Sequence, residues 1–124
     1  MDKKKSDPSY GFYCERDVML PMRDGIKLAT DIYFPCHGDG SIPKEKLPTL
    51  LVRTSYDKTA PEWDDIYPFF CRRGYVFVIQ DLRSRFRSEG DGKYFHAHNP
   101  WEGDDGYDTI EWLAKQKWSN KKIG

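Results

Sequence analysis

Alternating apolar and polar positions near the start of the chain predict two antiparallel strands joined by a tight turn. From residue 26 to residue 34, Ile, Leu, Thr, Ile and Phe alternate with Lys, Ala, Asp and Tyr. This period of two is typical of a strand with one better-buried face. The Asp24-Gly25 pair directly before it is strong turn chemistry. We therefore expect both strands within residues 14–35, followed by a loop that ends at Pro48.

Two later runs, residues 50–52 and 75–79, are apolar throughout, which is typical of strands covered on both faces. The segment between them carries helix signals: Pro61 at a first helical position, acidic residues after it, two arginines near its end and Gly74 as a stop. Pro68 is expected to kink or split this helix. The side chains predicted to face the sheet are Trp63, Ile66, Tyr67 and Phe70.

A second helix is predicted over residues 102–116, where acidic residues gather at the start. Residues 121–123 are expected to begin the next parallel strand. Apolar strands that alternate with helices indicate parallel β-α-β units. The predicted fold class is therefore α/β, with antiparallel strands first and the last strand interrupted. The inner face of the second helix is predicted to be Tyr107, Ile110, Leu113 and Ala114.

Charge and composition narrow the classes of protein. The 20 basic and 20 acidic residues cancel, so no overall field favours nucleic acid or an anionic membrane. No stretch approaches the roughly 20 apolar residues of a membrane span. Residues 1–11 lack the apolar core of a secretory signal and are expected to be a flexible charged arm, ahead of one incomplete domain over residues 12–124. The three cysteines match no metal spacing and are expected to be reduced, which favours a cytoplasmic location.

Candidate chemistry lies directly after the two apolar strands, because parallel α/β sheets form sites at the carboxyl ends of their strands. Tyr56 follows the first strand, and its phenol could donate to a developing oxyanion. A tyrosine that packs on the helix and bonds locally is the alternative, which the residues alone favour. The neighbouring Ser55 lacks the glycine-flanked elbow that exposes a nucleophile, so we exclude it as one.

The loop after the second strand holds a group of charged side chains. These could bind an anionic substrate, or an RNA backbone with Phe86 stacked on a base. An Asp–Arg network that ties the loop is the favoured alternative, because the net charge of the chain is zero. The charged residues are Asp81, Arg83, Arg85 and Arg87.

Two histidines further along, His96 and His98, could form a metal site with Asp104 and Asp105. His-x-His alone is a weak signal, and acidic residues are expected at a helix start without any metal. We therefore favour surface histidines and expect no metal.

Four blocks, taken in order and spacing, resemble a single family. They are MRDGIKLATDIYFP, LLVRTSYDK, FCRRGYVFVIQDLRSRFRSEG and EGDDGYDTIEWLAKQKWSNKKIG. The chain resembles, over nearly all of residues 17–124, the N-terminal part of the Xaa-Pro dipeptidyl-peptidase and cocaine-esterase-like (CocE/NonD) serine hydrolases. The resemblance implies an α/β-hydrolase fold, a Ser-Asp-His triad, a covalent acyl-enzyme and no cofactor.

The resemblance also implies roles for individual residues. Tyr56 matches the tyrosine of the family's Arg-Thr-Pro-Tyr segment, which donates its hydroxyl to the oxyanion, although Ser55 replaces the proline. Asp81 and Arg83 match the family's Asp-x-Arg-Gly and are expected to be structural residues near the site. Ser84 replaces the glycine there, which leaves the path of the loop open.

The family's nucleophile motif, Gly-x-Ser-x-Gly, does not occur in the sequence. None of the seven serines has glycine at both minus two and plus two. The resemblance therefore implies that all three triad members lie beyond residue 124. The histidines of this chain precede the expected serine and are not expected to act as the base; they are His37, His96 and His98.

Two functions follow from these observations. The first is the N-terminal part of a serine hydrolase acting on small-molecule esters, amides or Xaa-Pro peptides, inactive on its own and without nucleic-acid or membrane partners. The second is a non-catalytic α/β module that binds a partner or self-associates through an exposed sheet edge, at the strand that ends near Tyr56.

Overall fold

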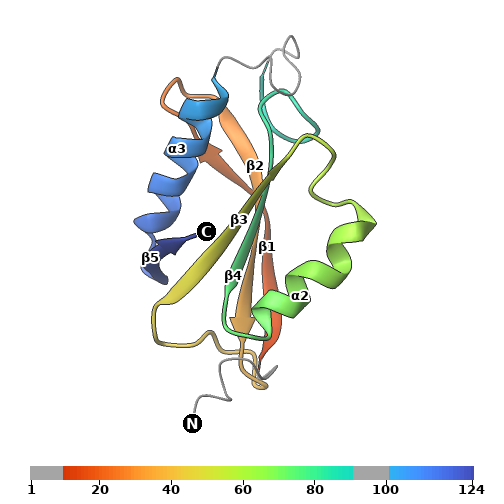
Figure 1. The fold of residues 1–124 in the computed structure, drawn as a ribbon, viewed down its shortest axis with the longest axis vertical. Helices are drawn as coiled ribbons and strands as arrows, with labels where there is room; N and C mark the ends of the chain where they lie inside the picture. The colour runs from red at the N-terminus through yellow and green to blue at the C-terminus, as the bar shows by residue number, and fades with distance from the viewer. Residues whose placement is uncertain (1–9, 91–100) are drawn as a thin grey trace.

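The architecture is a five-stranded sheet with a helix packed on each face (Figure 1). The computed structural model describes residues 10–90 and 101–124. The strand order is β1-β2-β4-β3-β5. β2 pairs antiparallel with β1 and β4, whereas β3 pairs parallel with β4 and β5. The strands are β1 (Gly11–Pro21), β2 (Lys27–Cys36), β3 (Leu47–Thr54), β4 (Val76–Asp81) and β5 (Ser119–Ile123). The predicted fold class is confirmed.

The two crossover connections place their helices on opposite faces of the sheet. β3 runs to β4 through η1 (Pro61–Asp65) and α2 (Ile66–Cys71), and β4 runs to β5 through α3 (Glu102–Ala114). The first connection moves one way along the sheet, and the second moves back past β3. Because parallel crossovers are right-handed, opposite directions require opposite faces. Figure 1 shows α2 and α3 on the two sides of the strands.

The predicted hairpin is confirmed, and β1 contains a bulge that the sequence pattern did not reveal. Glu15 pairs with Ile32 and Val18 with Thr30, so two residues of β1, Arg16 and Asp17, lie opposite one residue of β2. Such a bulge bends its strand and turns a side chain out of the regular alternation. The strand begins at Gly11, one residue inside the predicted N-terminal arm, and residues 1–9 of that arm lie outside the described residues.

The predicted first helix is confirmed and is split. The split falls between the 3-10 turn η1 and α2, ahead of Pro68. Pro68 is the third residue of α2, where its missing N–H would have no intrahelical partner in any case. Gly74 ends the segment with φ +92°, and the N–H of Tyr75 donates to the Phe70 carbonyl at 3.1 Å. This left-handed glycine cap is the stop that the sequence predicted.

The core has two layers, one on each face of the sheet. β4 lies between them and is buried along its whole length. Val76 and Val78 pack with Leu113 of α3 on one face, and Phe77 and Ile79 pack toward α2 on the other. β3 follows the same alternation between the two clusters. The continuous apolar runs of the sequence are therefore the two strands that contact both helical layers.

The predicted inner face of α3 was only partly right. Tyr107 is 60% exposed and Ile110 is 42% exposed, whereas Leu113 is buried as predicted. Asp105 and Thr109 are buried in their place. The sheet beneath them is polar, so α3 presents polar partners to it and leaves two apolar side chains outside.

The sheet edge expected at β3 is partly covered. β5 pairs with the first half of β3, and backbone hydrogen bonds join Gly124 to Thr49 and Leu51. Within the described residues, β5 has β3 as its single neighbour and is the outer strand on this side. It carries Lys121 and Lys122, and lysines on an edge strand oppose strand-to-strand association.

Two glycine substitutions test the cap after α2. Gly74→Ala forces alanine into the left-handed region, and we expect it to lower the free energy of unfolding by about 1–2 kcal/mol. A Cβ at position 74 meets only the Tyr10 ring at 3.7 Å, so the loss comes from the backbone. Gly103→Ala in α3 is the control, because nothing lies within 4 Å of its Cβ; it should raise the same free energy by about 0.5 kcal/mol. Urea titration measures both, and equal signs would contradict this account.

Candidate active site

The two segments singled out from the sequence meet at one edge of the sheet. Thr54 ends β3 and lies opposite Asp81, which ends β4. The Leu82 N–H donates to the Thr54 carbonyl at 2.9 Å, so the two loops are joined directly after the strands end. Parallel pairing therefore brings the Tyr56 loop and the arginine-rich loop together at the carboxyl ends of their strands.

Tyr56 projects from this edge while the backbone around it is held. It is 65% exposed. Its N–H donates to Thr54 Oγ1 at 2.9 Å. Asp57 follows with φ +81°, and its Oδ1 accepts from the N–H of Thr59 at 2.9 Å. Ser55 is 5% exposed, so it faces the protein rather than the solvent. The loop thus presents the phenol and buries the serine.

Asp81 connects the two loops through main-chain bonds. Its carboxylate accepts from the N–H of Lys58 at 2.9 Å and from the N–H of Arg87 at 3.3 Å. Burial raises the pKa of Asp81, and the two N–H donors counteract that rise. Asp81 is therefore a buried carboxylate that organises the backbone on either side of the Tyr56 site.

Arg83 holds a second set of partners, which the sequence analysis did not identify. Its guanidinium donates to both oxygens of Asp105, at 2.9 and 2.8 Å, and to both oxygens of Asp24, at 2.9 and 3.2 Å. The bond to Asp105 is the main cause that raises the pKa of Arg83. Arg83 joins the β1–β2 turn to the start of α3. Ion pairs thus anchor this loop, but the carboxylates that bind Arg83 belong to Asp24 and Asp105 and not to Asp81.

Lys58 is a residue that the sequence analysis missed. Its side chain is 1% exposed, and Nζ lies 2.7 Å from Asp17 Oδ1 and 2.9 Å from Asp31 Oδ1. A lysine in a polar loop carries no sequence signal of burial. Its partners come from the β1 bulge and from β2, more than 25 residues away in sequence, so only the fold brings them together.

Backbone strain gathers at this same edge. Four of the five non-glycine residues with positive φ in the described segments lie in the bulge or in the two loops. Strained residues persist where surrounding structure over-determines them, and they cluster at functional sites. The four are Asp17 (φ 52°), Asp57 (φ 81°), Ser84 (φ 66°) and Phe86 (φ 47°).

Comparison with known proteins assigns the family. Residues 24–124 match the family model described as X-Pro dipeptidyl-peptidase (S15 family). The chain belongs to this family. Cocaine esterase of a Rhodococcus species is 40% identical over an alignment of 116 positions; the alignment takes in 87% of this chain and 18% of the esterase. The chain spans about a fifth of the length of such relatives.

Solved structures agree with the assignment. An α-amino acid ester hydrolase is 35% identical with a TM-score of 0.68, over 95% of this chain and 21% of that protein. A CocE/NonD family hydrolase of Staphylococcus aureus is 28% identical with a TM-score of 0.70, over 91% of this chain and 22% of that protein. The predicted resemblance is confirmed: the fold is that of α/β hydrolases, and the family comprises esterases and X-Pro peptidases.

The alternative metal site is only partly within the described residues of this S15 family chain. His96 and His98 lie outside the described residues. Asp105 is paired with Arg83, and Asp104 lies 3.4 Å from Arg23. Within residues 10–90 and 101–124, no group of three or more His, Cys, Asp or Glu side chains is arranged to hold a metal ion. In the same residues, no helix is long and apolar enough to cross a membrane.

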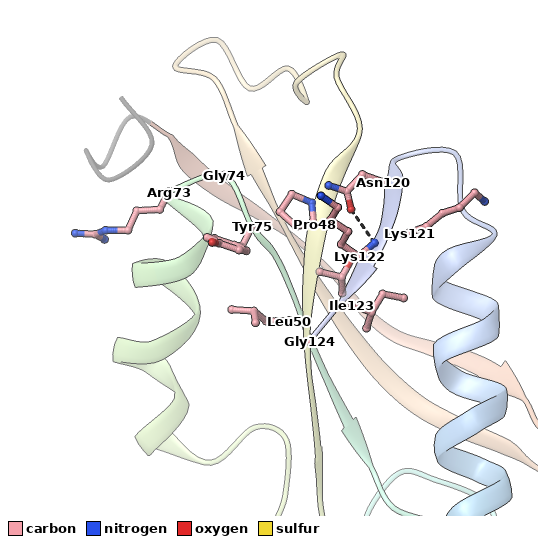
Figure 2. Close-up of a pocket in the computed structure, with 11 residues that line it drawn as sticks. Pro48, Leu50, Arg73, Gly74, Tyr75, Asn120, Lys121, Lys122, Ile123 and Gly124 are labelled. Atoms are coloured by element: carbon pink, nitrogen blue, oxygen red, sulfur yellow. Dashed lines mark hydrogen bonds between the residues drawn. The ribbon is translucent and has the colours of Figure 1, made fainter. Parts of the chain in front are cut away.

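A groove of about 980 Å³ lies elsewhere in the molecule. Figure 2 shows it between the end of α2 and β5. Its lining includes Pro48 and Leu50 of β3 and Tyr75, which directly precedes β4. The lining continues along β5 from Asn120 to Gly124. None of the described lining residues comes from the loops that follow β3 and β4, so the groove is separate from the Tyr56 site.

Conservative replacement tests the bridging role of Arg83. Lysine offers a single ammonium and cannot pair with two carboxylates through a planar fork, so Arg83→Lys should lower the free energy of unfolding at pH 7 by about 2 kcal/mol. Arg23→Lys is the control, because Arg23 is half exposed and should change stability little. Urea titration that gives equal losses for the two variants would contradict the bridge.

The ion pair between Arg83 and Asp24 also predicts how the stability of the fold responds to acid. The bond from Arg83 holds the pKa of Asp24 below its usual range. A carboxyl whose pKa is lower in the folded state stabilises the fold above its unfolded pKa of about 3.9, and that contribution is lost as the pH falls through the folded value. The stability of Arg83→Lys should therefore fall less than that of the unmodified chain between pH 5 and pH 3.

Proposed function

We propose that the chain forms the N-terminal part of a serine hydrolase active site, in which the Tyr56 phenol donates a hydrogen bond to the oxyanion. The observation that carries the proposal is the placement of Tyr56. Its phenol projects from the carboxyl end of β3 on a loop whose backbone is bonded on both sides. A donor that is held in place before reaction is what an oxyanion hole requires.

The chemistry of such a donor is limited to one part of the reaction. When a serine attacks an ester or amide carbonyl, the carbonyl oxygen gains negative charge in the tetrahedral intermediate. A phenol O–H aimed at that oxygen stabilises it more than it stabilises the substrate carbonyl. One donor of this kind contributes about 3 kcal/mol to the transition state. It does so only after a nucleophile has attacked.

We further propose that the nucleophile and its partners come from residues other than these 124. The absence of Gly-x-Ser-x-Gly from the sequence supports this, as does the burial of Ser55. In the family, the nucleophile elbow follows the strand that corresponds to β5. β5 lies beside β3, so a serine at its far end would come next to the Tyr56 loop.

The proposed substrates are small-molecule esters, amides or X-Pro peptides, cleaved through an acyl-enzyme. The family assignment supports this class, because its members include a protein named cocaine esterase and an α-amino acid ester hydrolase. The mechanism needs no cofactor or metal, since serine, base and oxyanion donors complete the acyl transfer.

The 124-residue chain on its own is expected to show no hydrolysis. An oxyanion donor without a serine and its base has no covalent intermediate to stabilise. Release of p-nitrophenol from p-nitrophenyl acetate measures this, with serum albumin at equal concentration as the background. Turnover above that background would overturn the proposed division of the site.

A chimaera tests the role of Tyr56 directly. The matched part of the chain replaces the segment of the Rhodococcus cocaine esterase that aligns with it, 18% of the esterase, and the esterase supplies the rest of the fold. Tyr56→Phe in this chimaera should lower kcat by about 100-fold to 1,000-fold with little change in KM, because the lost bond forms in the transition state.

The matched control for this test is Tyr107→Phe. Tyr107 is also an exposed tyrosine, at 60%, but lies on the outer face of α3. It should leave kcat and KM unchanged. If Tyr56→Phe behaved like Tyr107→Phe while the chimaera remained active, Tyr56 would not be the oxyanion donor.

A further inference from the structure

The buried ammonium of Lys58 occupies a position that stability alone does not explain. Its side chain is 1% exposed and contacts carboxylates from two strands, Asp17 at 2.7 Å and Asp31 at 2.9 Å. Taking ions out of water costs several kcal/mol for each, and apolar residues of similar volume often stabilise a fold as well or better. Because stability does not require these buried ions, their role is sought in the conformation of the segments that they join.

The contact between Lys58 and Asp17 favours the charged form of both side chains. Burial lowers the pKa of Lys58, but the hydrogen bonds to Asp17 and Asp31 more than offset this, so the pKa is raised overall. The bond from Lys58 in turn holds the pKa of Asp17 below its usual range. Arg16 lies 3.5 Å from the second oxygen of Asp31, which has no hydrogen-bond partner in the described part of the chain.

The β1 bulge forms the receiving side of the contact. The extra residue, Asp17, has φ +52°, and its N–H donates to Asp31 Oδ1 at 2.9 Å. Asp31 thus accepts from both Asp17 and Lys58 with the same oxygen. The carboxylate of Asp17 is directed at Lys58 because the bulge removes it from the regular alternation of the strand. A strained backbone and two carboxylates converge on one lysine.

Lys58 is also held through its main chain. Its N–H donates to Asp81 at 2.9 Å, so its backbone is fixed to the end of β4 while its side chain is fixed to β1 and β2. Tyr56 lies two residues earlier, and its own N–H is bound to Thr54. Only Asp57, in a left-handed conformation, separates the two anchored residues. The backbone that carries the phenol has little freedom left.

We propose that Lys58 is a positioning residue, which clamps the Tyr56 loop to the β1 bulge and β2 and so holds the phenol in place before a substrate arrives. The effect of Lys58 on catalysis rests on the proposed oxyanion role of Tyr56. Its effect on the order of the loop does not. Misplacement of a catalytic group by about 1 Å can cost about 100-fold in rate, which is why such an anchor matters.

Hydrogen exchange and fluorine NMR on the 124-residue chain test the clamp. Lys58→Met removes the ammonium and leaves the buried Asp31 with the exposed Arg16, at 3.5 Å, as its remaining cationic neighbour, which destabilises the whole fold. The decisive variant is therefore Lys58→Met with Asp31→Asn, which removes the two buried charges and keeps an oxygen that can accept from Asp17. Its free energy of unfolding should return close to that of the unmodified chain.

The order of the Tyr56 loop should not be restored in this variant, although its free energy of unfolding is. In the double variant we expect exchange of the Tyr56 and Lys58 amides to be faster by about 100-fold, while amides of β3 and β4 keep their protection. The 3-fluorotyrosine resonance of Tyr56, assigned by its loss in Tyr56→Phe, should broaden or move toward its unfolded position. Arg83→Met with Asp105→Asn is the matched control: it also removes a buried cation and the buried carboxylate that it contacts, and neither residue lies in the Tyr56 loop.

A double variant with wild-type exchange and a wild-type Tyr56 resonance would overturn the proposal, and Lys58 would then be a structural ion pair only. The proposal would fail equally if Arg83→Met with Asp105→Asn disordered the Tyr56 loop to the same extent. These measurements are independent of hydrolysis. An unchanged kcat for Tyr56→Phe in the chimaera would remove the oxyanion role and leave the clamp, and the reverse combination would remove the clamp alone.

Discussion

The parallel pairing of β3 with β4 is the constraint on which the rest of the structure depends. It places Thr54 opposite Asp81, so the two strands end together and their loops begin together. β4 is buried along its whole length between two helical layers, which makes this register costly to change: a shift by one residue would exchange the faces of Val78 and Ile79. The candidate active site inherits its geometry from the hydrophobic core beneath it.

Beyond the ends of these strands, ionic contacts take over from apolar packing. Three buried carboxylates, Asp31, Asp81 and Asp105, each bind a different segment: the β1 bulge and Lys58, the two loops, and Arg83. Hydrophobic side chains could fill the same space, but they would not fix backbone direction, because packing is not directional whereas hydrogen bonds to a carboxylate are. The S15 family chain therefore uses its most costly interactions where loop conformation matters most.

Much of this fold was visible in the sequence, because its signals are local. Strand runs such as residues 75–79, the Pro61 start and the Gly74 stop depend on neighbours in the chain. The misplaced face of α3 shows the limit: apolar periodicity selected Tyr107 and Ile110. Below this helix, however, lie Gln80 of β4 and Arg83 of the loop that follows it, and Thr109 and Asp105 bind them. Lys58 was missed because its contacts are also set by tertiary structure: Asp17 reaches it from the β1 bulge, which the sequence pattern did not reveal. Tyr56 could be singled out, but only the family resemblance gave it a role.

The placement of α2 and α3 on opposite faces has a consequence for the carboxyl edge of the sheet. The chain leaves β3 toward one face and leaves the adjacent β4 toward the other, so the two connections diverge from neighbouring strand ends. Such a divergence is a topological switch point, where open α/β sheets bind their ligands because neither connection covers the crevice between them. The path of the backbone alone therefore identifies as a binding site the same edge of the sheet that carries Tyr56.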